Sequence, residues 1–344
     1  MTTLSAAASH VGKVRANNQD SGYAGEHLFV VADGMGGHAG GDVASALAIQ
    51  SIAHIDRPFD TASDAAAALR DALLEANQEL AETVFEHPEL AGMGTTVSGF
   101  VRVGDRLALA HIGDSRVYRW RDGTLTQMTK DHTFVQRLVD SGRITAEEAA
   151  MHPRRSVLMR VLGDVELSPE IDVEVLETRP GDRWVLCSDG LSGFVEEDRI
   201  GELLDENPDA GAAVEALIEE SLDHGAPDNV TVIVVGVDDT PSSSAGLPQT
   251  VGSASRPLSY VSATQRRSAR LPALLLHPLT PVTDPEDEYF EPESEELLAE
   301  LNLAPSPTAA AQALVAVGDV LHLAGLSLLV VAALTRLGPS PLGW

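Results

Sequence analysis

Cysteine is nearly absent from this chain, which has a single one, Cys187, among 344 residues. No internal disulfide can therefore form. The residue ends the apolar run Trp184-Val185-Leu186-Cys187, which predicts a buried and unreactive thiol. Basic residues are also scarce, with 23 Lys and Arg against 52 Asp and Glu and a formal net charge of −29. That charge disfavours nucleic acid or a bare anionic membrane as the main partner.

The sequence also lacks the pattern of a signal peptide and a Walker-type nucleotide-binding motif. Residues 1–10 have neither a positively charged start nor an apolar core of signal-peptide length, so we expect the catalytic part to be cytoplasmic. No Gly-rich run followed by Lys and Ser or Thr occurs, which argues against a Walker-type nucleotide site. The hydrophobic share of 44% suffices for a sizeable core, and the length allows one large domain or two ordinary ones.

Residues 4–238 alternate between strand-like and helix-like runs and are interpreted as one α+β domain. Apolar or alternating runs predict strands at residues 28–32, 95–103, 106–112, 117–120, 124–128, 172–177, 183–188 and 230–237. Helical spacing predicts helices at residues 41–53, after an N-cap at Ser63, and at residues 209–222. The pair Asp122-Gly123 predicts a hairpin turn. Residues 131–164 are interpreted as a mobile flap containing a short helix capped by Thr145.

The remainder of the chain has a different composition. Residues 239–308 are predicted to form a linker, rich in Ser and Pro at first and acidic later. Nine acids and no base fall in residues 284–300, which we expect to stay solvated, with a docking site as the alternative. Residues 309–337 approach the length of a transmembrane helix but contain Asp319 and His322. This stretch is a candidate anchor to the inner face of the cell membrane, and a partner-docking helix is the alternative.

Four short aspartate motifs follow one another beside predicted strands: Asp33-Gly34, Gly113-Asp114-Ser115-Arg116, Ser188-Asp189-Gly190 and Asp228-Asn229. Each alone is first a turn signal. Together, and with Arg15 ahead of them, they predict a cluster of carboxylates held on strand ends. Hard cations such as Mg²⁺ or Mn²⁺ prefer oxygen ligands and retain several waters. The predicted chemistry is therefore the hydrolysis of phosphate esters.

These motifs resemble those of the metal-dependent (PPM, type 2C) serine/threonine protein phosphatases in their bacterial form. The resemblance covers residues 4–237 and includes the run from Arg15 to Asp20, Met93-Gly94-Thr95-Thr96, and Val230-Thr231 after the last motif. It implies a four-layer α-β-β-α sandwich with two packed antiparallel sheets and a flap. The cations would lie in a cleft at one end of the sandwich, and we expect a largely disordered tail to follow the domain.

The resemblance also implies two core Mn²⁺ or Mg²⁺ ions and a third, weaker one. Asp33 would bridge the core ions, the carbonyl of Gly34 would bind one of them, and Asp189 and Asp228 would bind the other. Asp114, Asp189 and Ser156 of the flap would form the third site. The paired ions would lower the pKa of a bridging water, so that a metal-bridged hydroxide attacks phosphorus and no covalent phosphoenzyme is needed.

Further roles follow from the same resemblance. Arg15 has a planar fork of donors that can bind two phosphate oxygens, and Asp20 and Asn229 are expected to hold the waters and ligands around the ions. Many relatives have glutamate where this chain has Gln19, which predicts weaker metal binding. The candidate general acid is His38, with a metal-bound water and a purely structural role for this histidine as alternatives. The pair Asp131-His132 is either structural or substrate-contacting.

The leading hypothesis is a monomeric enzyme that hydrolyses phosphoserine and phosphothreonine in proteins and opposes a serine/threonine kinase. Only the resemblance favours protein substrates over small phosphoesters. One alternative is a catalytically inactive relative that acts as a regulatory binding module, and another is a hydrolase of nucleotides or other small phosphoesters. The intact aspartates argue against the inactive alternative, because clustered like charges destabilise a fold unless a cation binds.

Overall fold

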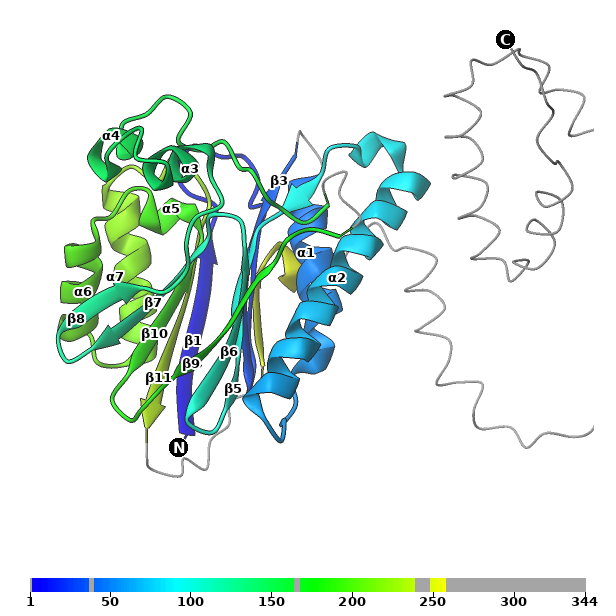
Figure 1. Cartoon of the computed structure of the whole chain (residues 1–344). Helices are drawn as coiled ribbons and strands as arrows, with labels where there is room; N and C mark the ends of the chain where they lie inside the picture. The colour runs from blue at the N-terminus through cyan, green and yellow to red at the C-terminus, as the bar shows by residue number, and fades with distance from the viewer. Residues whose placement is uncertain (1, 37–39, 164–167, 239–247, 258–344) are drawn as a thin grey trace, which may run out of the picture. The chain divides into compact units, whose positions relative to one another are not determined.

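Two antiparallel β-sheets lie face to face, with helices on their outer faces, in the part of the chain that the structure describes (Figure 1). The structure is a computed structural model and describes residues 2–36, 40–163, 168–238 and 248–257. The predicted acidic segment at residues 284–300 and the candidate anchor at residues 309–337 lie outside this part. Within it, no helix has the length and apolar character needed to cross a membrane.

One sheet has five strands and brings the two ends of the predicted domain together. Its order is β1 (Thr2–His10), β11 (Val230–Asp238), β10 (Arg183–Cys187), β7 (Arg116–Arg121) and β8 (Thr124–Gln127). The pairing of β1 with β11 runs from Thr2 opposite Asp238 to His10 opposite Val230. Chain segments that are distant in sequence therefore form one edge of this sheet.

The second sheet has seven strands and carries the first aspartate motif. Its order is β12 (Gln249–Gly252), β2 (Asp20–Ala24), β3 (Leu28–Met35), β5 (Val97–Val103), β6 (Arg106–Ile112) and β9 (Asp172–Glu177), and the short β4 (Gly94–Thr95) also pairs with β3. Every strand pair in both sheets is antiparallel. The predicted pair of packed antiparallel sheets is confirmed.

Helices complete the outer layers. In Figure 1, α1 (Gly41–Ile52) and α2 (Ala62–Glu86) cover the seven-stranded sheet, and α6 (Glu197–Glu206) and α7 (Ala210–Asp223) cover the five-stranded sheet. The flap contains α3 (Phe134–Asp140) and α4 (Ala146–Ala150). The short helices are α5 (Asp189–Ser192), η1 (Ala53–Ile55), η2 (Pro88–Leu90) and η3 (Ser253–Ser255).

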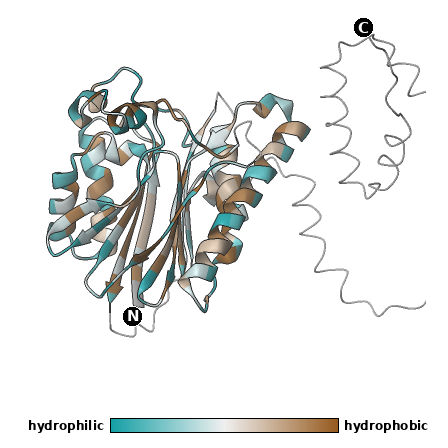
Figure 2. Ribbon diagram, in the orientation of Figure 1, coloured by the Kyte–Doolittle hydropathy of each residue, from teal (hydrophilic) through white to brown (hydrophobic). Residues whose placement is uncertain are grey.

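Three apolar clusters hold these layers together. One lies under α1 and α2, one lies under α6 and α7, and the third fills the space between the sheets. In the third cluster, the ring of Phe100 is 5.3 Å from that of Phe29 and 5.8 Å from that of Trp184. Figure 2 shows hydrophobic and hydrophilic residues mixed along the strands, and helices that alternate between the two kinds, as expected for half-buried helices.

Several local predictions are confirmed, and one helix cap was assigned to the wrong residue. Asp122 and Gly123 both have positive φ, 51° and 77°, as a tight hairpin between β7 and β8 requires. Thr145 caps α4 and forms a capping box with Glu148. The N-cap of α2 is Thr61, whose side chain accepts a hydrogen bond from the Asp64 backbone, so the prediction of Ser63 was wrong.

The linker prediction is wrong for residues 249–255. These residues form β12 and η3, and β12 pairs with β2 from Gln249 opposite Ala24 to Gly252 opposite Ser21. These residues are mostly polar and show no alternation of apolar side chains that would predict a strand. They join the sheet at its edge through backbone pairing with β2.

Candidate active site

The first two acids of the site lie on neighbouring strands. Asp20 begins β2 and stands directly opposite Asp33 of β3. Two like charges in opposed positions of an antiparallel pair repel each other. Asp20 is held by Ser188, whose hydroxyl donates a 2.7 Å hydrogen bond to the Asp20 carboxylate and accepts one from the Thr231 backbone N–H. The first aspartate motif is thereby tied to the third and fourth.

The other acids converge on this pair from separate segments. Asp114 follows β6, Asp189 begins α5 directly after β10, and Asp228 precedes β11. Burial raises the pKa of Asp20 to about 7, that of Asp114 to about 8 and that of Asp189 to about 6. It also holds the pKa of Asp33 well above its ordinary range. Neighbouring carboxylates raise these pKa values further, so without a cation the folded site favours protonated carboxyls, and a bound cation would displace these protons.

The glycines of the motifs let neighbouring backbone segments pack closely. A turn alone therefore does not explain why each motif contains a glycine. A Cβ atom on Gly34 would lie 1.9 Å from the carbonyl oxygen of Gly41, and one on Gly190 would lie 1.8 Å from that of Asn229. Gly113 has φ +111°, and a Cβ atom there would lie 2.4 Å from the Thr96 Cβ. Only glycine lets these segments approach closely enough to bring the aspartates together.

A threonine pair fixes the backbone of Asp33. The Thr96 hydroxyl accepts a 3.0 Å hydrogen bond from the Asp33 backbone N–H, and the Thr95 hydroxyl donates a 2.9 Å bond to its carbonyl oxygen. The Thr96 hydroxyl also lies 2.7 Å from that of Ser115, next to Asp114. The motif Met93-Gly94-Thr95-Thr96 therefore holds two of the aspartate segments in register.

Arg15 lies on the solvent-exposed side of the acid cluster. Its guanidinium forms a 2.6 Å ion pair with Asp228, and its charge also acts on Asp189 and Asp33. The loop that carries Arg15 is held by Asn229, whose side chain accepts from the Gln19 backbone N–H and donates to the carbonyl oxygens of Val11 and Asn17. Asn229 thus orients this loop through its backbone.

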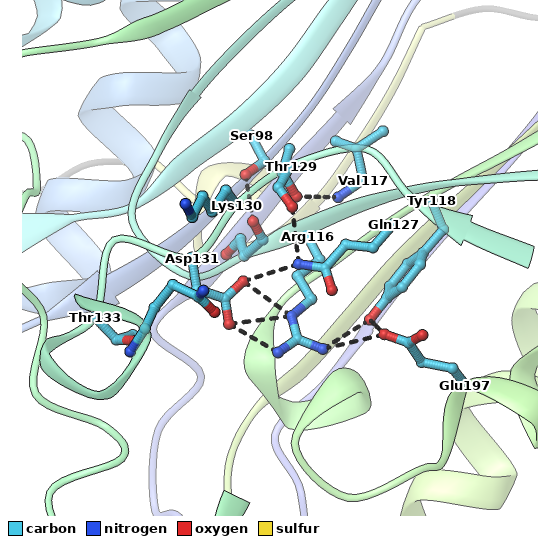
Figure 3. A network of polar contacts seen from close by, with 12 residues as sticks. Ser98, Arg116, Val117, Tyr118, Gln127, Thr129, Lys130, Asp131, Thr133 and Glu197 are labelled. Carbon is cyan, nitrogen blue, oxygen red and sulfur yellow. Dashed lines mark hydrogen bonds and ion pairs between the residues drawn. The ribbon is translucent and has the colours of Figure 1, made fainter. Parts of the chain in front are cut away.

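The flap is anchored by residues for which the motifs predicted no firm role. Figure 3 shows Arg116 bound to Asp131 through two nitrogens, at 3.0 and 2.7 Å, with Tyr118 and Glu197 beside it. His132 is buried and bonds to Asp172 and to the Gly113 backbone N–H. Of the two alternatives left open for Asp131-His132, these contacts favour the structural one.

The flap and loop candidates for the site differ in what the structure says of them. Ser156 is exposed on the flap and, in the described part of the chain, shares no hydrogen bond with the acids. Its neighbour Arg155 is the flap residue whose charge lowers the pKa of Asp189; the sequence interpretation missed it. His38 lies outside the described residues. Cys187 is fully buried with its pKa raised to about 12, as predicted for an inert thiol.

The donor set suits hard divalent cations that keep water ligands. Among the described residues, no three His, Cys, Asp or Glu side chains form a ready-made ligand set for one ion, and Asp228 is paired with Arg15. The mutual effects on the pKa values nevertheless place five carboxylates within one another's electrostatic range. Buried carboxylates whose charge nearby arginines compensate only in part are what partly hydrated Mg²⁺ or Mn²⁺ ions neutralise.

Comparisons with known proteins agree with this geometry. The sequence profile described as Protein phosphatase 2C matches residues 8–226. The serine/threonine protein phosphatase PstP of Mycobacterium tuberculosis H37Rv is 51% identical over 234 residues, which are 68% of this chain and 45% of the relative. The serine/threonine phosphatase stp of Listeria monocytogenes EGD-e is 35% identical over 66% of this chain and 93% of the relative. This chain thus spans less than half of the length of the mycobacterial relative.

Solved structures show the same architecture. The crystal structure of the M. tuberculosis phosphatase PstP/Ppp has a TM-score of 0.65 at 50% identity, covering 69% of this chain and 100% of that one. The PstP catalytic domain in complex with two manganese ions has a TM-score of 0.64 at 48% identity, covering 69% and 99%. On the strength of the profile match, the relatives and the shared fold, this chain belongs to the protein phosphatase 2C family.

Proposed function

We propose that this chain is a metal-dependent protein phosphatase that hydrolyses phosphoserine and phosphothreonine in proteins and opposes a serine/threonine kinase. The observation that carries the proposal is the convergence of buried, mutually repelling carboxylates beside a half-exposed arginine. Relatives named as serine/threonine phosphatases support it. The catalytic domain would include residues 4–255, because β12 and η3 pack on β2.

Within this proposal, Asp33, the Gly34 carbonyl, Asp189 and Asp228 would hold two core Mn²⁺ or Mg²⁺ ions. Asp114 would hold a third together with Asp189 and Ser156. The two manganese ions in the PstP structure support the core pair. When bound, such ions supply an activated water near neutral pH and neutralise charge on the phosphoryl oxygens.

The chain's own residues would bind and orient the substrate. Arg15, whose side chain is about half exposed, would turn its guanidinium fork to two oxygens of the phosphate. Asp20 and Asn229 would keep the neighbouring ligands in place through their buried hydrogen bonds. His38 is our candidate for protonating the leaving hydroxyl. A cytoplasmic location, a membrane tether and a monomeric state remain predictions from the sequence.

Hydrolysis by the full-length chain tests the proposal. With Mn²⁺, a phosphothreonine peptide and an aryl phosphate should both be hydrolysed, and a chelator should stop both reactions. Asp33→Asn and Asp189→Asn should each lower kcat by at least about 100-fold, the scale expected for losing one electrostatic stabiliser of the transition state. Asp71→Asn, on the exposed face of α2, is the matched control and should leave kcat unchanged.

Three outcomes would overturn the proposal. Unchanged rates in Asp33→Asn and Asp189→Asn would place the site elsewhere. No hydrolysis in Mn²⁺, together with a melting temperature that a chelator does not alter, would favour an inactive binding module. Faster turnover of a nucleoside phosphate than of the phosphopeptide would favour a hydrolase of small phosphoesters.

A further inference from the structure

Residues 249–255, here called the strap, join the edges of the two sheets. The strap consists of β12 and η3 and lies beyond residue 226, where the family profile ends. β12 pairs with β2 of the seven-stranded sheet. The side-chain oxygen of Gln249 accepts a 3.1 Å hydrogen bond from the backbone N–H of Ala7, on β1 of the five-stranded sheet. The strap therefore contacts both sheets, at β2 in one and at β1 in the other.

The strap contacts the loop that carries Arg15. Ser253 is buried, and its hydroxyl donates a hydrogen bond to the carbonyl oxygen of Asn18. The Asn18 side-chain oxygen in turn accepts a 3.1 Å bond from the Asp20 backbone N–H. Gly252 has φ +71°, and a Cβ atom there would lie 2.2 Å from the carbonyl oxygen of Asp20. The strap thus touches the backbone on both sides of Gln19.

A relay of buried hydroxyls extends this contact to β3. The backbone N–H of Ala254 donates to the Ser21 hydroxyl at 3.0 Å, which lies 2.9 Å from that of Ser45. Ser45 donates its proton to the carbonyl oxygen of Gln19 at 2.5 Å, so the Ser21 hydroxyl must be the donor to Ser45.

The relay ends beside the first aspartate motif. The carbonyl oxygen of Gln19 also accepts a 3.2 Å hydrogen bond from the backbone N–H of Gly34. Ser21 and Ser45 are both fully buried, so a lost partner could not be replaced by bulk water without cost. In this series of hydrogen bonds from Ala254 to Gly34, each donor group has one defined acceptor.

We propose that the strap positions the active site by holding residues 18–21 against β3, with Gly252 and Ser253 as positioning residues. Without the strap, the carbonyl of Asn18 and the hydroxyl of Ser21 each lose a partner, and the loop that presents Arg15 and Asp20 shifts. The activity readout of this inference depends on the proposed phosphatase function, whereas the geometric readout does not.

Substitutions in the full-length chain test the inference. Gly252→Ala forces the strap away from Asp20, and Ser253→Ala removes only the bond to Asn18. Thr250→Ala is the matched control, since Thr250 is exposed on the same strand. Ser253→Thr keeps the hydroxyl and serves as the conservative rescue variant. The readouts are kcat/KM for a phosphothreonine peptide with Mn²⁺, inhibition by inorganic phosphate, and hydrogen exchange of the amides of residues 18–21.

We expect Gly252→Ala and Ser253→Ala to lower kcat/KM by about 10-fold, because a displacement of about 1 Å in an active site can cost about 100-fold. Weaker inhibition by phosphate and faster exchange at residues 18–21 should accompany this loss. Ser253→Thr should restore all three quantities, and Thr250→Ala should change none of them.

The inference is overturned if Gly252→Ala and Ser253→Ala lower only the melting temperature and leave kcat/KM, phosphate inhibition and exchange as in the unmodified chain. If the unmodified chain hydrolyses neither the phosphothreonine peptide nor an aryl phosphate, the proposed function is wrong, but the inference about the strap is still testable by hydrogen exchange. Faster exchange at residues 18–21 in Ser253→Ala but not in Thr250→Ala then supports the strap, and equal exchange refutes it.

Discussion

The acidic residues of the site keep their charges close together at the expense of stability. Asp20 and Asp33 are opposed on neighbouring strands, and burial raises the pKa of Asp20, Asp114 and Asp189. Arg15 offsets part of this charge through its pair with Asp228. A cation that binds here gains from a repulsion that folding has already imposed.

This repulsion predicts how the stability of the metal-free protein depends on pH. A carboxyl whose pKa is raised by folding stays protonated in the folded state while it ionises in the unfolded state, so unfolding releases protons. The stability contributed by these groups is fully present below their ordinary pKa of 3.8 and is lost as pH rises through about 6 to 8. In a chelator, the melting temperature should therefore fall between pH 5 and pH 8, about the range of these pKa values.

Controls separate the site from the rest of this acidic chain. Asp33→Asn removes one of the repelling groups and should flatten the decline, whereas Asp71→Asn should leave its slope unaltered. Excess Mn²⁺ should also flatten it, because the ions compensate the carboxylates. A melting temperature that rises over this range in the chelator would contradict the assignment of these acids to one cluster.

The sequence was enough to predict site residues where the chemistry needs a particular side chain. It was not enough to predict which residues contact one another. The aspartates and Arg15 could be identified because carboxylates and a guanidinium fork suit cations and phosphate. The pairing of Arg15 with Asp228 joins residues far apart in sequence, and Arg116 stood in a motif without a role until its bond to Asp131 was seen. Such contacts depend on tertiary packing, which no local pattern encodes.

Among the elements, α5 owes its position to one glycine. Gly190 follows Asp189 in this helix, and a Cβ atom there would meet the Asn229 carbonyl oxygen at 1.8 Å. Gly190→Ala must therefore push α5 away from the segment that carries Asp228. We expect a loss of unfolding free energy of about 2 to 3 kcal/mol, as for other overpacked sites, together with a fall in kcat.

Gly201→Ala is the matched control in a helix that has room. A Cβ atom at Gly201 of α6 would make ordinary contact, 3.7 Å from the Leu125 Cβ, so this change should stabilise the protein by about 0.5 to 1 kcal/mol. Urea unfolding of both variants measures the difference. Equal unfolding free energies would show that the contact of Gly190 with Asn229 is not tight.

Most of the elements missed from the sequence have weak periodic signals. β1 reads Thr-Thr-Leu-Ser-Ala-Ala-Ala-Ser-His and becomes a strand by pairing with the strongly apolar β11. β2 and β12 are short and polar. α6 was missed although its buried residues, Ile200, Leu203 and Leu204, have helical spacing, because the helix is short and almost all its other positions are polar or charged. Elements with continuous apolar runs, such as β10 and β11, were found because burial on both faces leaves a clear pattern.

For the molecule as a whole, the single cysteine reports on global unfolding. Cys187 is fully buried in β10 at the centre of the five-stranded sheet, so a thiol reagent should reach it only when that sheet opens. If Mn²⁺ binds the folded state alone, labelling in the regime of fast reclosing should be about 100-fold slower at 100 times the dissociation constant.

A chelator should restore the faster labelling. The labelling rate should depend on urea concentration with the same slope as the unfolding equilibrium measured by tryptophan fluorescence. Equal slopes would show that the reagent reaches the thiol through unfolding and not through the surface of the folded protein. Rapid labelling of the folded protein, unaffected by Mn²⁺ or urea, would contradict the burial of this thiol.

The pairing of β1 with β11 sets an order of events during synthesis. β1 leaves the ribosome early, but its partner is complete only when residue 238 has followed it, and the strap that borders the Arg15 loop comes later still. Early in translation the nascent chain must therefore carry an unmated strand, a hazard for aggregation. Because contacts between distant residues slow folding, the domain cannot complete its two sheets until β11 and β12 have both emerged.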